Sequence, residues 1–296
     1  YPFASAGAFS QNSRNFAKLL GMKNKIGGFD VADSTSISNF AVNLVNKIDL
    51  MIVPSGFARD AYISSGVNTP VEILPHGIPD EFFRNGPVST NNSDIIKLRK
   101  AKESGYILIL FFLIHSEHRK GADIVRNVLK RIQKKFGNVY LVVKGPNCSY
   151  FSGVNTINIT SWMSNDDLVA LYDTCDACVC PSRGGGFELN ALEAVSRGIP
   201  TLVTGKGCFL DLINYFIPIR ISNIATQSLP GNVIHIGFGC EPDIDDFEVK
   251  LTDVISRTDY WKNRYKEISK EVKDIYTWKM TAQKLDNILR NYEFIE

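Results

Sequence analysis

The amino-acid sequence predicts an α/β protein with two doubly wound parallel-sheet domains, and three observations lead to this fold class. The chain has 296 residues, which is more than one ordinary domain contains. From residue 106 onward, apolar runs of strand length alternate with amphipathic segments of helix length, an order typical of a parallel sheet covered on both faces. Residues 84–94 combine Gly and Pro with a Ser, Thr and Asn cluster, which predicts an interdomain linker.

The composition excludes several classes of protein. Hydrophobic residues make up 44% of the chain and charged residues 22%, as in globular proteins rather than disordered or fibrous ones. The 33 basic and 31 acidic residues are mixed along the chain, so no broad field favours a nucleic-acid partner. The six cysteines form no paired CxxC motifs and are expected to be buried thiols in a reducing compartment. We therefore expect a cytoplasmic protein, with peripheral contact to a membrane as an option.

The first domain is expected to cover residues 1–78 and to be incomplete. A Gly-rich strand precedes Asp30, a short apolar strand covers residues 49–54, and a helix follows at 57–65. Only about 75 residues precede the linker, and the chain opens at Tyr1 rather than at an initiator Met. The sequence is thus expected to be a fragment that lacks about half of this domain.

The second domain is expected to cover residues 79–276, with a last helix at 277–296 that crosses back to the first. Its longest apolar run, residues 106–114, is a buried strand, because it is too short to span a bilayer. Parallel sheets bind ligands beyond the carboxyl ends of their strands. We therefore expect one crevice lined by the loops that follow four of the predicted strands, after Ile114, Val143, Cys180 and Val203.

Residues 181–200 combine a glycine run with the start of a helix near residue 189. Glycines let backbone amides approach a ligand, and a helix start presents unpaired N–H groups, so a diphosphate fits there. The binding loop is predicted to comprise Gly184, Gly185, Gly186, Phe187 and Glu188. Glu193, one turn into the helix, is placed to accept hydrogen bonds from ribose hydroxyls. The structural alternatives are a flexible loop and a solvated helix glutamate.

This segment resembles the family-4 retaining glycosyltransferases of the GT-B fold, in which two Rossmann-like domains face a cleft. The matching residues are Pro181, Ser182, Gly186, Phe187, Leu192, Glu193, Ala194, Gly198 and Pro200. In that family a first glutamate holds the donor sugar and a second holds the ribose. The second corresponds to Glu193, whereas the first falls on Gly185, and Glu188 stands where the family has glycine.

Residues 115–123, HSEHRKGAD, resemble the family's loop after the first strand of the C-terminal domain. The resemblance implies that Arg119 and Lys120 bind the donor diphosphate. Cations beside the leaving oxygens stabilise charge that grows in the transition state, so no metal or other cofactor is expected. His115 occupies the place of the family's usual arginine, while Lys144 either faces the same crevice or is an ordinary surface lysine. A solvated basic turn is the alternative for Arg119 and Lys120.

The N-terminal half offers weaker candidates. Asp33 either faces the acceptor or caps a helix, and the capping interpretation is favoured. His76 stands at the expected cleft in a segment that resembles the end of the family's first domain. Gly7 and Ser10 are candidates for an acceptor loop. Asp166 and Asp167 are expected to belong to a helix start capped by Ser164 or Asn165.

The resemblance implies a glycosyltransferase that moves a sugar from a nucleotide-diphosphate donor to a glycan, lipid-linked or protein acceptor, with retention of configuration. Two alternatives stay open. The missing first glutamate and the short first domain favour a non-catalytic nucleotide-sugar-binding scaffold. A GT-B-shaped sugar-nucleotide epimerase shares the crevice, although no clear acid and base pair is present in the sequence.

Overall fold

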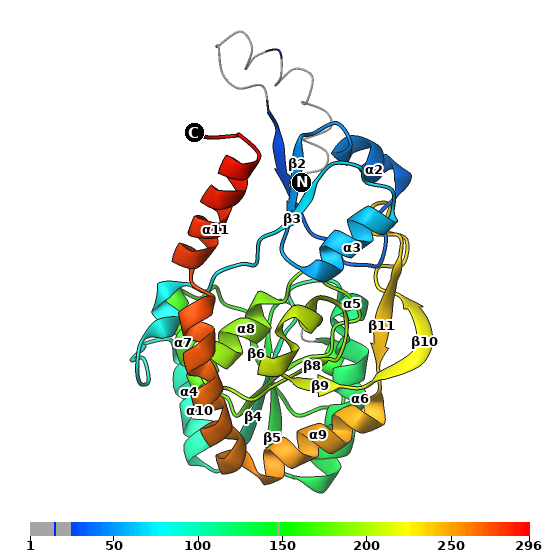
Figure 1. Ribbon diagram of the computed structural model, residues 1–296. Helices are drawn as coiled ribbons and strands as arrows, with labels where there is room; N and C mark the ends of the chain where they lie inside the picture. Colours follow the sequence, from blue (N-terminus) through cyan, green and yellow to red (C-terminus); the bar gives the residue numbers. More distant parts are fainter. Residues whose placement is uncertain (1–14, 16–24, 147–148) are drawn as a thin grey trace.

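The computed structural model describes residues 15, 25–146 and 149–296, which form two bodies stacked on one another (Figure 1). The smaller body contains a parallel sheet in the order β1-β2-β3, made of β1 (Gly27–Phe29), β2 (Leu50–Val53) and β3 (Val71–Ile73). Two helices, α2 (Asn39–Val45) and α3 (Gly56–Ser64), pack on it, and their first turns are capped by Ser38 and Ser55. The strand and helix predicted at 49–65 are confirmed.

The larger body contains six parallel strands in the order β6-β5-β4-β7-β8-β9. They are β4 (Ile107–Phe112), β5 (Val139–Lys144), β6 (Thr156–Ile159), β7 (Ala177–Cys180), β8 (Thr201–Thr204) and β9 (Ile217–Ile219). Along the chain, the strands are added outward from β4 through β5 to β6, and then on the other side from β7 through β8 to β9. The loops after these two strands therefore diverge, and such a switch point is where doubly wound sheets bind ligands.

Helices cover both faces of the six-stranded sheet. They are α4 (Ser93–Glu103), α6 (Ala122–Lys135), α7 (Asn165–Thr174), α8 (Leu189–Ser196), α9 (Ile244–Ser256) and α10 (Thr258–Ile275). Two short 3₁₀ helices, η1 (Asp80–Phe83) and η2 (Ser149–Phe151), and a longer one, η3 (Gly207–Tyr215), connect some elements. The α/β fold with doubly wound parallel sheets is thus confirmed. Cys175, Cys178, Cys180 and Cys208 are buried free thiols, as expected.

Helix α11 (Trp278–Asn291) returns from the larger body to the three-stranded sheet (Figure 1, red). Its Leu285 and Ile288 pack against Leu50, Ile52 and Leu74. At the crossing, Ile78 pairs with Thr277 in a parallel bridge, so both connections between the bodies run side by side. From this arrangement, we propose that the first domain ends near residue 78 and that the crossing helix begins near residue 277.

A hairpin of β10 (Ile221–Gln227) and β11 (Phe238–Pro242), which the sequence did not predict, projects from the larger body. Its connecting loop and β11 contact the segment after β1. The amide of Thr35 donates to the carbonyl of Phe238 over 2.9 Å, and the amide of Ser38 donates to the carbonyl of Ile234 over 2.9 Å. The hairpin therefore ties the two bodies together beside the cleft (Figure 1, yellow).

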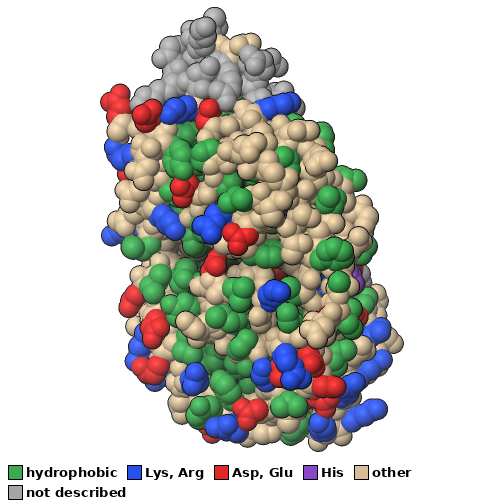
Figure 2. All heavy atoms as spheres, turned by 45° about the vertical axis from the view of Figure 1, so that its right-hand side comes forward, with side chains coloured by type: hydrophobic (Ala, Val, Ile, Leu, Met, Phe, Trp, Pro, Cys, Tyr) green, Lys and Arg blue, Asp and Glu red, His purple; other side chains and the backbone are tan. Residues whose placement is uncertain are grey.

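The carboxyl ends of both sheets face one another. Ser55, directly after β2, donates its hydroxyl to the carbonyl of Gly186 over 2.7 Å, and Gly56 donates its amide to Asp211 over 2.7 Å. Figure 2 shows cationic, anionic and apolar side chains interspersed on one face of the molecule. Within the described ranges, no helix is both long and apolar enough to cross a membrane.

Candidate functional site

Two loops meet at the switch point of the six-stranded sheet, one after β4 and one after β7. Gly121 has a φ of +72°, and a Cβ placed on it would lie 2.3 Å from the carbonyl oxygen of Pro181. Only glycine allows this close approach of two backbones at a positive φ. Thr204, at the end of β8, donates its hydroxyl to the carbonyl of Ser182 over 2.7 Å. A Cβ on Gly145, after β5, would likewise lie 1.9 Å from the carbonyl oxygen of Leu113, after β4, so contacts link the ends of all four strands whose loops were predicted to share a crevice.

Arg119 and Lys120 lie in a single helical turn, α5 (Glu117–Lys120), within the loop after β4. Ser116 before this turn adopts a left-handed conformation, with φ 60° and ψ 56°. Such strain in a non-glycine residue is typical of functional loops. The Arg119 side chain is 7% exposed, and its Nη1 donates to the carbonyl of Gly184 over 3.0 Å. Its buried Nε has no hydrogen-bond partner among the described residues, so this N–H is available to a ligand.

Glu188 holds these cations in place from the loop after β7. Its side chain is 2% exposed and accepts hydrogen bonds from Lys120 Nζ over 2.5 Å and from Ser182 Oγ over 2.9 Å. Arg119 Nη1 lies 3.8 Å from the same carboxylate. A Cβ placed on Gly185 would lie 2.8 Å from Oε1 of Glu188. A side chain at position 185 would therefore require the Glu188 carboxylate, which Ser182 and Lys120 hold, to move.

The glycine run contacts the smaller body rather than open solvent. The Gly186 amide donates to Oδ1 of Asp33 over 3.0 Å, and Arg119 Nη1 lies 3.6 Å from the same oxygen. A Cβ on Gly184 would lie 2.1 Å from the carbonyl oxygen of Asp33, so this glycine permits the close approach. The predicted helix-capping role of Asp33 is wrong, because Ser38 caps α2. Asp33 instead places a carboxylate between an amide and a guanidinium.

Glu193 lies one turn into α8, as the sequence predicted. Its Oε2 accepts a hydrogen bond from the hydroxyl of Tyr172 over 2.8 Å. The Tyr172 ring in turn stacks on Phe112 at the end of β4, with ring centroids 5.5 Å apart. Burial raises the pKa of the Glu193 carboxyl, and the tyrosine hydrogen bond opposes this shift. Glu193 is thus a largely buried carboxyl group next to the switch point, not a solvated helix residue.

Two other predicted cations have different surroundings. His115 is exposed, and its Nδ1 lies 2.8 Å from the hydroxyl of Ser116. Lys144 is 9% exposed at the end of β5, where its Nζ donates to the carbonyl of Ser161 over 2.6 Å. Burial lowers the pKa of Lys144, and Asp94 partly offsets this effect. The structure therefore engages Lys144 with the segment after β6 rather than with Glu188.

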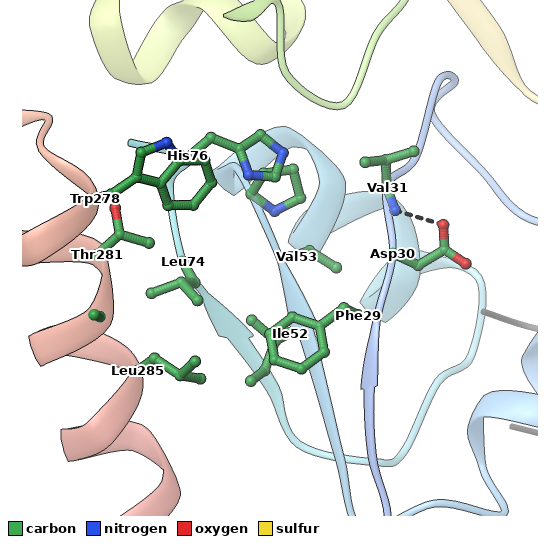
Figure 3. Close-up of a pocket in the computed structure, with 12 residues that line it drawn as sticks. Phe29, Asp30, Val31, Ile52, Val53, Leu74, His76, Trp278, Thr281 and Leu285 are labelled. Carbon is green, nitrogen blue, oxygen red and sulfur yellow. Dashed lines mark hydrogen bonds between the residues drawn. The ribbon is translucent and has the colours of Figure 1, made fainter. Parts of the chain in front are cut away.

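The acceptor-side candidates lie around a pocket of about 540 Å³ on the three-stranded sheet. Figure 3 shows His76 and Trp278 at one end of this pocket, and Ile52 and Leu285 at the other. The His76 imidazole lies edge-on to Phe187 of the glycine-rich loop, with ring centroids 5.0 Å apart. Burial lowers the pKa of His76, so its imidazole is neutral at neutral pH. Gly7 and Ser10 lie outside the described residues.

Sequence reasoning missed the role of Arg183 within the same loop. Its guanidinium is 5% exposed and pairs with Asp123 over 2.7 Å and with Glu241 over 2.6 Å. These two acids come from α6 and β11, so Arg183 fastens the base of the glycine-rich loop to both elements. A buried arginine requires acidic partners, but these two acids lie about 60 residues away in the sequence. No local motif could therefore predict the network.

The predicted helix start at residue 164 is confirmed. Ser164 caps α7 by accepting from the amide of Asp167 over 3.2 Å. Asp167 accepts hydrogen bonds from Thr90 and Asn92, and Asp166 pairs with Arg84 over 2.6 Å. Both acids thereby fasten the linker to the larger body. In the described part of the chain, no group of three or more His, Cys, Asp or Glu side chains is placed to hold a metal ion.

Comparisons with known proteins agree with this geometry. Residues 107–215 match the family model Glycosyl transferases group 1. The chain is 31% identical over 249 residues to "Uncharacterized protein 356" of Sulfolobus islandicus rod-shaped virus 1, covering 81% of this chain and 69% of that protein. It is 28% identical over 251 residues to "Putative glycosyltransferase 45" of Sulfolobus islandicus filamentous virus, covering 81% and 66%.

A solved structure with a similar fold is the UDP-forming α,α-trehalose-phosphate synthase from Burkholderia vietnamiensis. Its TM-score is 0.69 at 12% identity, over 94% of this chain and 69% of that chain. Two parallel-sheet bodies whose carboxyl ends face one another define the GT-B class of glycosyltransferase folds. The chain belongs to the Glycosyl transferases group 1 family. It spans about two thirds of the length of the two viral relatives, 69% and 66%.

Proposed function

We propose that this chain contains the donor site of an enzyme that transfers a sugar from a nucleotide-diphosphate donor to an acceptor. The observation that carries the proposal is the position of the Asp33 carboxylate. An oxyanion already sits between the Gly186 amide, at 3.0 Å, and the Arg119 guanidinium, at 3.6 Å. A phosphate oxygen needs the same donors, and the unpartnered Nε of Arg119 adds a further one.

Each residue of the site has a distinct role in this proposal. Arg119 and Lys120 stabilise the negative charge that develops on the departing nucleotide diphosphate. Glu193 accepts hydrogen bonds from the ribose through Oε1, because Oε2 already accepts from Tyr172. Glu188 orients Lys120 and supplies the carboxylate that the family's first glutamate supplies from position 185. Asp33 occupies the phosphate position until the donor replaces it.

The acceptor side is proposed to be the cleft end of the pocket in Figure 3. His76 stands there at the carboxyl end of the three-stranded sheet, with its ring against Phe187 of the glycine-rich loop, and Asp30 lies at the carboxyl end of β1. A neutral imidazole can accept a hydrogen bond from an acceptor hydroxyl. We propose transfer with retention of configuration, in line with the family resemblance. Glycan, lipid-linked and protein acceptors all present such hydroxyl groups.

A calorimetric titration with UDP-, GDP- and ADP-sugars tests the proposal. The same samples are assayed for slow release of free nucleotide, which reports donor hydrolysis in the absence of acceptor. We expect binding of one nucleotide class together with release, and NMR of the released sugar then gives the anomeric outcome. Binding without release would favour a nucleotide-sugar-binding scaffold. Absence of binding to every donor would contradict the site.

A further inference from the structure

A second pocket, of about 500 Å³, lies at the end of α8 that is remote from the glycine-rich loop. It is bounded by residues 84–87, by the turn after α8 and by one face of α10. Its lining contains one carboxylate, Asp173, and six cations, which are Arg84, Arg197, Lys262, Lys266, Lys270 and Lys273. The whole chain has nearly balanced charge, with 33 basic and 31 acidic residues. This local excess of positive charge therefore differs from the rest of the molecule.

The nearby carboxylates are already used. Asp173 pairs with Arg197 over 2.8 Å, and the remaining Arg197 donors bind the carbonyls of Phe82, Arg84 and Gly86. Asp176 is shared between Lys262, at 2.7 Å, and Lys102. Arg197 thus forms a fixed wall of the pocket with no N–H left for a ligand. Asp173 compensates the charge of Arg197, whereas Asp176 serves two lysines and so leaves one positive charge unbalanced beside the pocket.

Lys266 and Lys273 are not held by a carboxylate at ion-pair distance. Across the residues that the structure describes, neither forms an ion pair. Lys273 is half-buried; burial and the charge of Arg197 lower its pKa, and the charge of Asp173 opposes this shift. Both lysines line a hollow that already carries positive charge, Lys266 from an exposed position and Lys273 from a half-buried one.

The spacing of the lysines on α10 adds a second observation. Lys262, Lys266 and Lys270 follow one another at four-residue intervals, and Lys273 lies three residues further on. Residues at these intervals share one face of a helix, and like charges there repel one another and weaken the helix. A bound anion would remove this repulsion.

We propose that this pocket binds a phosphate-bearing anion through Lys266 and Lys273, separately from the donor site. Lysine ammonium groups bind phosphate as point charges, and a pocket of this volume is large enough for a small ligand. Two sources present the same chemistry, a free oligophosphate and the phosphate headgroup of an anionic lipid. The proposal does not depend on sugar transfer, because its residues take no part in the donor site.

Calorimetric titration with inorganic tripolyphosphate tests the proposal in the full chain. The titrations use a Lys120→Ala background, which removes one cation of the proposed donor site, and the lysine variants are compared within this background. The test variant carries Lys266→Gln and Lys273→Gln, and the matched control carries Lys279→Gln and Lys284→Gln on exposed positions of α11. We expect at least a tenfold loss of affinity in the test variant and less than a twofold change in the control. Equal affinity in both would overturn the proposal.

Vesicle flotation distinguishes the two sources. Phosphatidylcholine vesicles with and without phosphatidic acid are mixed with the same two variants. Binding to the acidic vesicles that disappears with Lys266→Gln and Lys273→Gln assigns the site to lipid headgroups. Tripolyphosphate binding without vesicle binding assigns it to free phosphates. If the unaltered pocket binds neither probe, the proposal is wrong, and thermal unfolding of each variant verifies that the fold is intact.

Discussion

Glu188 and Gly185 act as one unit in the loop after β7. The carboxylate of residue 188 lies where a side chain at residue 185 would begin, and it also binds Lys120. A side chain at position 185 would therefore displace the Glu188 carboxylate from its present place. We propose that the two departures from the family pattern compensate one another, with Glu188 supplying the carboxylate that the family has at the position of Gly185.

This compensation predicts non-additive effects. Gly185→Glu alone introduces a clash and a second negative charge, and Glu188→Gly alone leaves Lys120 buried without its partner. The double variant relieves both problems, so we expect it to be more stable than the sum of the single changes by at least about 1 kcal/mol. Denaturant unfolding of the four proteins measures this coupling. Simple additivity would show that the two positions act independently.

Glu193 predicts a pH dependence of stability. Because burial raises its pKa above the ordinary value of 4.5, the folded state holds the proton more tightly than the unfolded state. Its contribution to the free energy of unfolding therefore falls as pH rises through 4.5 toward the folded pKa, and is constant above it. Glu193→Gln removes this loss, so its stability advantage over the wild type should grow with pH in that window.

Unfolding curves at several pH values measure the difference between Glu193→Gln and the wild type. An advantage that grew as the pH fell would mean that the carboxylate is stabilised by its surroundings. Glu193→Gln should also weaken nucleotide binding, because the amide is a poorer acceptor for two ribose hydroxyls than a carboxylate. Tyr172→Phe is the control for the hydrogen bond to Oε2, which lies on the other side of the carboxyl group.

Among the elements, the β10–β11 hairpin determines how the two bodies are joined. Gly237 precedes β11, and a Cβ placed on it would lie 2.4 Å from the amide nitrogen of Ser36. We expect Gly237→Ala to destabilise the protein by about 1 to 3 kcal/mol, because the hairpin must shift away from that segment. Gly137→Ala is the matched control, since its Cβ would meet no atom within 4 Å. Similar unfolding midpoints for both variants would contradict this role of the hairpin.

The sequence predicted some elements far better than others. Helix α6 and strand β4 have strong periodicity or a continuous apolar run, so their positions followed directly from the residues. Strand β10 has a mostly exposed, polar pattern, and the loop and strand β11 that follow it contact residues 33–38, about 200 residues away in the sequence. In the site, Arg119, Lys120 and Glu193 were found through local motifs. The contacts of Asp33 and Arg183 depend on the tertiary fold, which no local pattern encodes.

For the whole molecule, the proposed function centres on the cleft between the bodies. The glycine-rich loop of the larger body contacts the segment after β1 so closely that Asp33 enters the anion position. We propose that a nucleotide-diphosphate donor displaces this carboxylate and that the two bodies separate locally as it does so. On this proposal, donor binding is linked to the contact between the bodies, which the hairpin and α11 maintain on either side (Figure 1).

The most direct test of the donor site compares two charge changes with the preferred nucleotide-sugar. Calorimetric titration measures donor binding, and release of free nucleotide measures turnover. Asp33→Asn keeps an acceptor for the Gly186 amide but removes the competing charge, so we expect about five- to tenfold tighter binding, about 1 to 1.4 kcal/mol. Lys120→Ala should mainly lower turnover, by about 100-fold or more, because it removes charge stabilisation in the transition state. The predicted result is tighter donor binding by Asp33→Asn and slower turnover by Lys120→Ala. Weaker binding by Asp33→Asn together with unchanged turnover by Lys120→Ala would contradict the account.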